Sequence, residues 1–134
     1  MKQIVQTIGA VLAGVFVAFI MTVQFEKLGA YWFPLPNPHP SPLEYMDYMA
    51  TSPALLHGLS ILGYGVSIFL GAYVGGRLSP STHRSRGAYI TGFSYLLPVV
   101  VMLVGFPRPI WAILGILIIM PLSTRISVFL LQNR

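Results

Sequence analysis

The sequence contains no cysteine. This absence excludes disulfides, thiolate metal sites and the quinone oxidoreductases that pair two cysteines within a small helical bundle. Charged residues are also scarce, because they make up 8% of the 134 residues, whereas a soluble domain carries roughly 25%. Apolar residues account for 55% of the chain. We therefore predict an integral membrane protein that has lipid as its main solvent.

Acidic residues are the scarcest charged group. Three Asp and Glu stand against eight Lys and Arg, which gives a net charge of +5. Nucleic-acid-binding proteins are also basic, but they cluster their basic residues on a polar face or in runs, whereas here the charges lie between apolar blocks. The sequence also lacks a phosphate-binding glycine loop, a nucleophile elbow and a metalloprotease helix motif. We expect neither a nucleic-acid partner, nor a cofactor, nor enzymatic activity.

Four segments are long and apolar enough to cross a membrane, which takes about 20 residues. They are residues 4–25, 54–76, 87–106 and 110–131. The first lacks a clear small-x-small cleavage site and is interpreted as a retained helix, not a signal peptide. We predict one all-α domain with four transmembrane helices and an outer loop over residues 26–53. Whether the end of the fourth segment crosses or lies on the membrane is left open.

Basic residues predict the orientation, because Lys and Arg concentrate in short cytoplasmic segments. With both termini in the cytoplasm, six basic residues lie inside and two lie outside. The inner six are Lys2, Arg77, Arg84, Arg86, Arg125 and Arg134, and the outer two are Lys27 and Arg108. Four of the inner arginines are candidate contacts for anionic lipid, namely Arg77, Arg84, Arg86 and Arg125. We predict a bacterial inner-membrane protein with the lipid bilayer as its first partner.

Small residues recur at every fourth position in the first two predicted spans. Such stripes allow membrane helices to approach closely, so we predict that these two spans pack against each other. The predicted packing residues are Ala10, Gly14 and Ala18 in the first span and Gly63, Ser67, Gly71 and Gly75 in the second.

Proline occupies every second position of "FPLPNPHPSP", residues 33–42. This pattern predicts an extended, stiff spacer near polyproline II, of roughly 25 Å. Ser41, followed by proline and then by Glu44, matches a capping box, so we expect a short helix over residues 42–50 on the outer membrane surface. Ser52, again followed by proline, predicts the cap of the next helix. The candidate partner surface comprises Tyr31, Trp32, Phe33, Leu43 and Met46.

Ionisable side chains inside membranes are functional suspects, and none of the four predicted spans contains a carboxylate. His57 and Arg125 remain. We interpret the lone His57 as a hydrogen-bonded interfacial residue and Arg125 as a cation that extends to the inner surface. On the outer side, His39, Glu44 and Asp47 lack the three or four converging ligands of a zinc site. No metal site is predicted.

Three motifs, "YWFPLP" at residues 31–36, "GAYVGG" at 71–76 and "PRPIW" at 107–111, resemble a family of small four-helix bacterial membrane proteins that is known only as uncharacterised. The resemblance implies the four-span layout and no particular activity.

Three functions follow as hypotheses. The first is an accessory or interaction subunit that packs against a larger membrane protein complex or forms a homo-oligomer. The second is a small oligomeric carrier or channel, with a pathway along helices kinked at Pro98 and Pro121. It is weakened by the missing carboxylate. The third is an enzyme that acts on lipid or quinone through His57.

Overall fold

The computed structural model describes residues 1–35, 37, 39–105 and 108–133, and these described residues form helices and connecting segments without a strand. The predicted calls that fall on Pro36, Pro38, Phe106, Pro107 and Arg134 therefore lie outside the described residues. The elements are α1 (Lys2–Trp32), α2 (Pro42–Thr51), α3 (Ala54–Leu78), a 3-10 turn η1 (Ser81–His83), α4 (Arg84–Gly105) and α5 (Ile110–Gln132).

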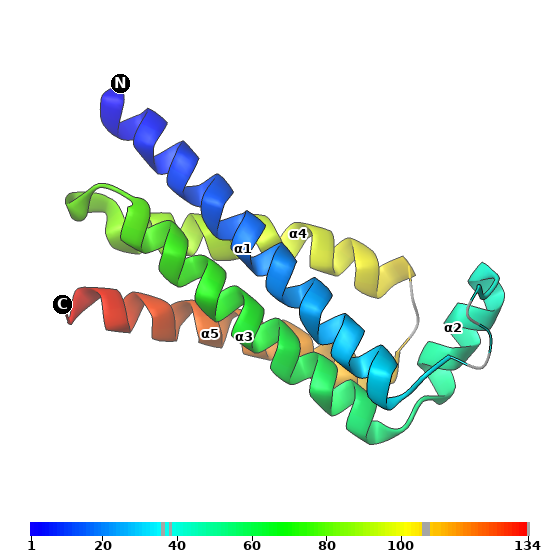
Figure 1. The fold of residues 1–134 in the computed structure, drawn as a ribbon. Coiled ribbons are helices and arrows are strands. Elements are labelled where there is room, and N and C mark those ends of the chain that lie inside the picture. Colours follow the sequence, from blue (N-terminus) through cyan, green and yellow to red (C-terminus); the bar gives the residue numbers. More distant parts are fainter. Residues whose placement is uncertain (36, 38, 106–107, 134) are drawn as a thin grey trace.

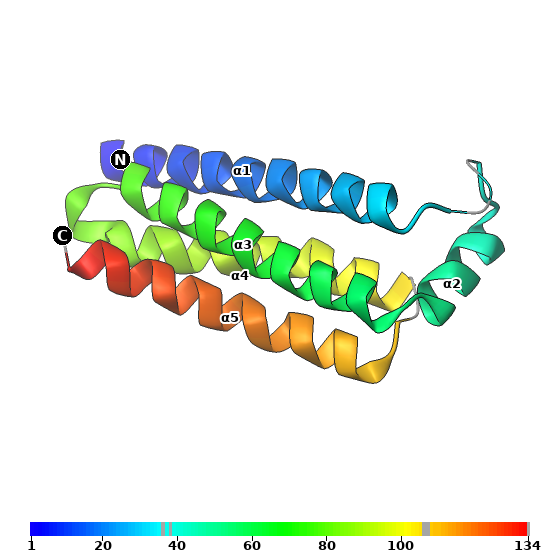
Figure 2. The ribbon, with the colours of Figure 1, turned by 60° about the horizontal axis from the view of Figure 1, so that its bottom comes forward.

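Four of these helices, α1, α3, α4 and α5, are long and apolar enough to cross a membrane, which confirms the predicted all-α architecture with four spans. They lie side by side as a bundle (Figure 1). The start of α1, the α3–α4 turn and the end of α5 lie at one end of the bundle, while α2 lies at the other (Figure 2). The two ends therefore differ in structure: one has short turns, the other a helical extension.

Helix α1 continues past the predicted end of its span, as far as Trp32. The backbone N–H of Phe33 still donates to the Gly29 carbonyl at 2.8 Å, so the helical ladder runs until Pro34, which has no N–H to donate. The expectation that residues 26–32 belong to a loop was therefore wrong. The apolar run ends at residue 25, but loss of hydrophobicity does not end a helix, and no helix breaker precedes Pro34.

Helices α1 and α3 approach closely where small residues meet. A Cβ built on Gly14 would lie 2.5 Å from the Gly71 carbonyl oxygen and 3.0 Å from the Gly75 nitrogen. A Cβ built on Gly71 would lie 2.7 Å from the Cβ of Ala18. These separations leave no room for larger side chains, so the backbones themselves form the interface.

The small-residue stripe is buried along its length. Gly63 lies against Phe25, where an added Cβ would approach the phenyl ring to 2.8 Å. The remaining predicted packing residues are also buried, namely Ala10, Ala18 and Ser67.

Mostly larger side chains form a hydrophobic core cluster around α3. Its buried residues come from all four long helices, and they are Ala18, Tyr64, Ile68, Tyr95, Val99, Leu103, Ile116 and Met120. Pro98 and Pro121 lie inside α4 and α5, and each helix continues through its proline. Both prolines are exposed, so the core is formed by the opposite faces of these helices.

The proline-rich segment packs along α2. The chain bends at Asn37 and His39, and the Asn37 side-chain amide donates to a Glu44 carboxylate oxygen at 3.2 Å. The Ser41 hydroxyl accepts from the Glu44 backbone N–H at 3.2 Å, as the capping pattern predicted. The described part of this segment is therefore hydrogen-bonded to α2 through Asn37 and Ser41, and the extended, stiff spacer over residues 33–42 stays a prediction.

Helix α2 turns one side toward the bundle and leaves the other exposed. Met49 is buried, Met46 is half-buried, and Leu43 is 77% exposed. The Tyr48 hydroxyl donates to the Phe33 carbonyl at the end of α1, which holds the helix in this rotation. Leu43 of the predicted partner surface is thus exposed and Met46 is partly covered, and their contact with a partner stays a prediction.

Ser52 does not cap α3. Its hydroxyl donates to the Tyr48 carbonyl at the end of α2, and Pro53 occupies the N-cap of α3 without a side-chain cap.

Candidate functional site

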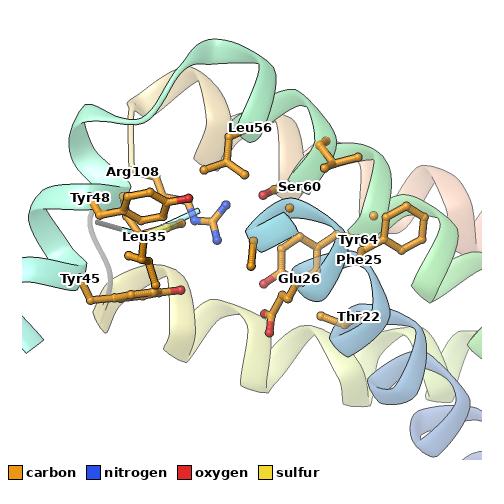
Figure 3. Close-up of a pocket in the computed structure, with 15 residues that line it drawn as sticks. Thr22, Phe25, Glu26, Leu35, Tyr45, Tyr48, Leu56, Ser60, Tyr64 and Arg108 are labelled. Carbon is orange, nitrogen blue, oxygen red and sulfur yellow. The ribbon is translucent and has the colours of Figure 1, made fainter. Parts of the chain in front are cut away.

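A cleft with about 90 Å³ of free space lies at the α2 end of the bundle. Its walls come from the end of α1, from α2, from the start of α3 and from the α4–α5 connection (Figure 3). Six apolar side chains and seven polar ones contribute to it. The apolar set is Phe25, Ala30, Leu35, Met49, Leu56 and Leu59, and the polar set is Thr22, Glu26, Tyr45, Tyr48, Ser60, Tyr64 and Arg108.

Two opposite charges face this cleft. Figure 3 shows the Arg108 guanidinium directed into the space. The Glu26 side chain extends from α1, with its carboxylate lower in the view. Among the described residues no ion pair within 4.0 Å joins them, and the buried Nη1 of Arg108 has no hydrogen-bond partner. A buried guanidinium N–H without an acceptor is unfavourable by about 1–3 kcal/mol. The cleft therefore presents a cation and a carboxylate that do not neutralise each other directly.

Tyrosines line the α2 side of the cleft. Burial raises the pKa of the Tyr45 hydroxyl, the charge of Glu26 raises it further, and the charge of Arg108 opposes both. Tyr45 thus lies in the fields of both charges. Burial also raises the pKa of Tyr48, whose hydroxyl is bonded to the Phe33 carbonyl.

A hydrogen-bonded pair lies at the bundle side of the cleft. The hydroxyls of Thr22 and Tyr95 share a hydrogen bond, and Thr22 also donates to the Ala18 carbonyl at 2.9 Å. This pair connects α1 to α4 where the cleft meets the core, so the α1 wall of the cleft is held by side-chain bonding as well as by packing.

His57 does not reach the cleft. Its side chain is fully buried and meets the Trp111 ring edge-on, with ring centroids 5.8 Å apart. The interfacial, hydrogen-bonded histidine expected from the sequence is instead a buried packing residue between α3 and α5. In this structure the imidazole is closed to a substrate.

The predicted partner surface is divided by the structure. Tyr31 and Trp32 are 80% and 57% exposed and belong to the last turn of α1. Leu43 is exposed on α2, whereas Phe33 and Met46 are partly buried. None of these five lines the cleft, so the cleft and the exposed aromatic residues are separate features of this end.

The arginines predicted to contact anionic lipid lie away from the cleft. Arg77 lies in the last turn of α3 and Arg84 begins α4, so both lie at the end of the bundle that also holds the start of α1 (Figure 2). Arg77, Arg86 and Arg125 are exposed, and Arg84 is partly buried. Their lipid contacts remain a prediction.

The charged residues and the tyrosine that line the cleft, Glu26, Arg108 and Tyr45, were not predicted as site residues from the sequence. Glu26 was assigned to a loop, so the argument from a missing carboxylate overlooked it. A signal was present, because no helix breaker separates Glu26 from the apolar run. Arg108 and Tyr45 carried no such signal, since their meeting depends on where α2 and the start of α5 lie relative to each other.

A second feature is an apolar groove of about 410 Å³ between α3 and α5. Gly58 lies in it, and no heavy atom of the described residues comes within 4 Å of a Cβ built there. Leu62, Phe69 and Ile126 also line it, and Ser123 is one of its few polar contributions. The groove is therefore an open apolar surface on the side of the bundle.

Comparisons with known protein families, with curated proteins and with solved structures found no match. The cleft and the groove are accordingly interpreted from their own geometry.

Proposed function

We propose that this protein is a small accessory subunit of a bacterial inner membrane, with both termini in the cytoplasm. The distribution of basic residues supports the orientation, and the three motifs that resemble small bacterial four-helix membrane proteins support the location. In this orientation the cleft, the proline-rich segment and α2 face the outer side, where α2 lies along the membrane surface.

The α3–α5 groove carries the proposal. Grooves floored by glycine let a neighbouring transmembrane helix approach closely, and close packing is the main source of helix association in lipid. Gly58 is open to such a neighbour, whereas Gly14 and Gly71 are already occupied by contacts within the chain. We assign the groove to a helix of a larger membrane protein.

The test fills the groove without disturbing the chain. A Cβ at position 58 meets no described heavy atom within 4 Å, and leucine suits a helix better than glycine by roughly 1 kcal/mol, so we expect the fold to persist. We expect wild-type protein, purified in mild detergent at native expression, to carry a stoichiometric partner that Gly58→Leu loses. Gly9→Leu is the matched control, because Gly9 is also open but lies on α1, and it should keep the partner.

Two results would contradict the accessory role. The first is a partner that Gly58→Leu retains at full stoichiometry. The second is purification as free monomer alone.

The carrier or channel remains the alternative function, since Glu26 lies on a helix beside a cleft. Substrate flux into reconstituted vesicles that is abolished in Glu26→Gln would favour this alternative over the accessory role.

A further inference from the structure

The cleft has the charge pattern of a site for a zwitterion. Arg108 directs a guanidinium into it (Figure 3), and one nitrogen of that group lacks an acceptor among the described residues. Glu26 offers a carboxylate to the same cleft. A ligand with an anionic and a cationic group satisfies both, whereas a purely anionic ligand meets repulsion from Glu26.

The depth of the cleft points to a membrane lipid. The apolar run of α1 ends at residue 25, so Glu26 marks the level where hydrocarbon gives way to headgroups. Tyr31 and Trp32 follow within the same helix, and these residue types favour the headgroup level. Leu56 and Leu59 line the cleft beside the charges, so an acyl chain has apolar contacts next to a polar head.

The size of the cleft agrees with a small headgroup. One water takes roughly 10–15 Å³ of such space, so about 90 Å³ accommodates a group of several non-hydrogen atoms. Phosphoethanolamine, with about eight, is of this size. Its ammonium donates three hydrogen bonds. The hydroxyl oxygens of Tyr48 and Tyr64, whose protons are donated elsewhere, can accept such bonds.

We propose that the cleft binds the headgroup of a phosphatidylethanolamine lipid, with the phosphate against Arg108 and the ammonium against Glu26. Arg108 is suited to the phosphate because guanidinium donors match its oxygens. This inference does not rest on the accessory role, since it requires only that the bundle lies in a membrane.

The experiment measures lipid binding to the purified full-length protein by native mass spectrometry. Phosphatidylethanolamine, phosphatidylglycerol and phosphatidylcholine with identical acyl chains are added in turn. We expect one equivalent of phosphatidylethanolamine to bind, roughly ten-fold more tightly than the others, because phosphatidylglycerol lacks the cation and the choline ammonium has no N–H to donate. Equal binding of all three lipids, or a preference for phosphatidylglycerol, would overturn the proposal.

Variants locate the site. Arg108→Gln and Glu26→Gln should each weaken phosphatidylethanolamine binding roughly ten-fold, while Arg108→Lys and Glu26→Asp, which keep the charge, should bind better than the glutamine variants. The matched controls are Lys27→Gln and Asp47→Asn, which remove a nearby charge outside the cleft lining and should bind as the wild type does. Unchanged phosphatidylethanolamine binding in Glu26→Gln would contradict the proposed contact between the ammonium and Glu26.

Two further measurements distinguish loss of the site from misfolding and a lipid ligand from a free headgroup. Thermal unfolding in detergent identifies a variant that fails to fold, and the charge-keeping variants then decide the question. Glycerophosphoethanolamine, the same head without acyl chains, tests a free zwitterion as the ligand. Weak binding of this compound supports a lipid ligand, whereas binding as tight as that of the intact lipid would overturn it.

Discussion

At the scale of single residues, stability depends on positions where a small change of side chain alters a charge or a contact. Tyr45 is the clearest case outside the membrane-spanning helices. Its hydroxyl lies in a partly apolar cleft, and both Glu26 and Arg108 act on it. Because burial disfavours the tyrosinate, the folded protein holds the Tyr45 proton to higher pH than the unfolded chain does.

This difference predicts a loss of stability in alkali. The folded-state pKa of Tyr45 is raised above 10.0, so its contribution is fully present below that pH and is lost as pH rises through the folded-state value. We expect the thermal midpoint to fall less between pH 9 and pH 11 in Tyr45→Phe than in wild type, with pH values chosen to bracket the ordinary tyrosine pKa of about 10. Tyr31→Phe, at an exposed position, is the control and should behave as wild type. An equal fall in Tyr45→Phe would contradict the prediction.

At the scale of elements, helix pairing depends on whether backbones touch. The α1–α3 contact is formed at Gly14 and Gly71, where each glycine faces the carbonyl oxygen of the other helix. The sequence indicated this pairing through the four-residue spacing of small residues. It did not indicate how α2 is rotated, because the short helix has apolar residues on more than one side and the Tyr48 bond to α1 selects among them.

The α1–α3 contact predicts an asymmetry between two glycines. Gly71→Ala places a methyl group 2.6 Å from the Gly14 carbonyl oxygen, so we expect a loss of about 1–3 kcal/mol of stability. Gly9→Ala, where the added methyl meets no described atom within 4 Å, should leave stability unchanged or raise it by up to about 1 kcal/mol. Equilibrium unfolding by sodium dodecyl sulfate in mixed micelles measures both, and coincident midpoints would show that the helices do not pack as described.

At the scale of the whole molecule, side-chain sizes are arranged for lipid as the solvent. Small residues fill the α1–α3 interface, while leucine, isoleucine and phenylalanine cover the outside, as at Leu12, Phe16 and Phe19 of α1. Charges gather toward the two ends of the bundle. This arrangement is the expected one where burial of apolar surface supplies no driving force and close packing does.

The proposed orientation is tested with the cysteine-free chain itself. Single cysteines are placed at Leu43 and Ser81, which are both exposed, and are treated with a membrane-impermeant maleimide. Leu43 belongs to α2 and Ser81 to the α3–α4 turn, which lie at opposite ends of the bundle (Figure 1). We expect Leu43→Cys to react in intact cells and Ser81→Cys to react only after permeabilisation. The reverse pattern would invert the orientation, and partial labelling of both would contradict a single one.

The sequence by itself determined the four long helices, the small-residue stripe and the Ser41 cap, because each depends on residues that are close along the chain. Periodicity and local hydrogen bonding are sufficient for such features. It misplaced the end of α1, since hydrophobicity and helicity end at different residues, 25 and 32. Only the tertiary structure decided the cleft. Glu26, Tyr45 and Arg108 come from three separate parts of the chain, and their meeting depends on the tertiary placement of α1, α2 and the start of α5, which no local pattern encodes.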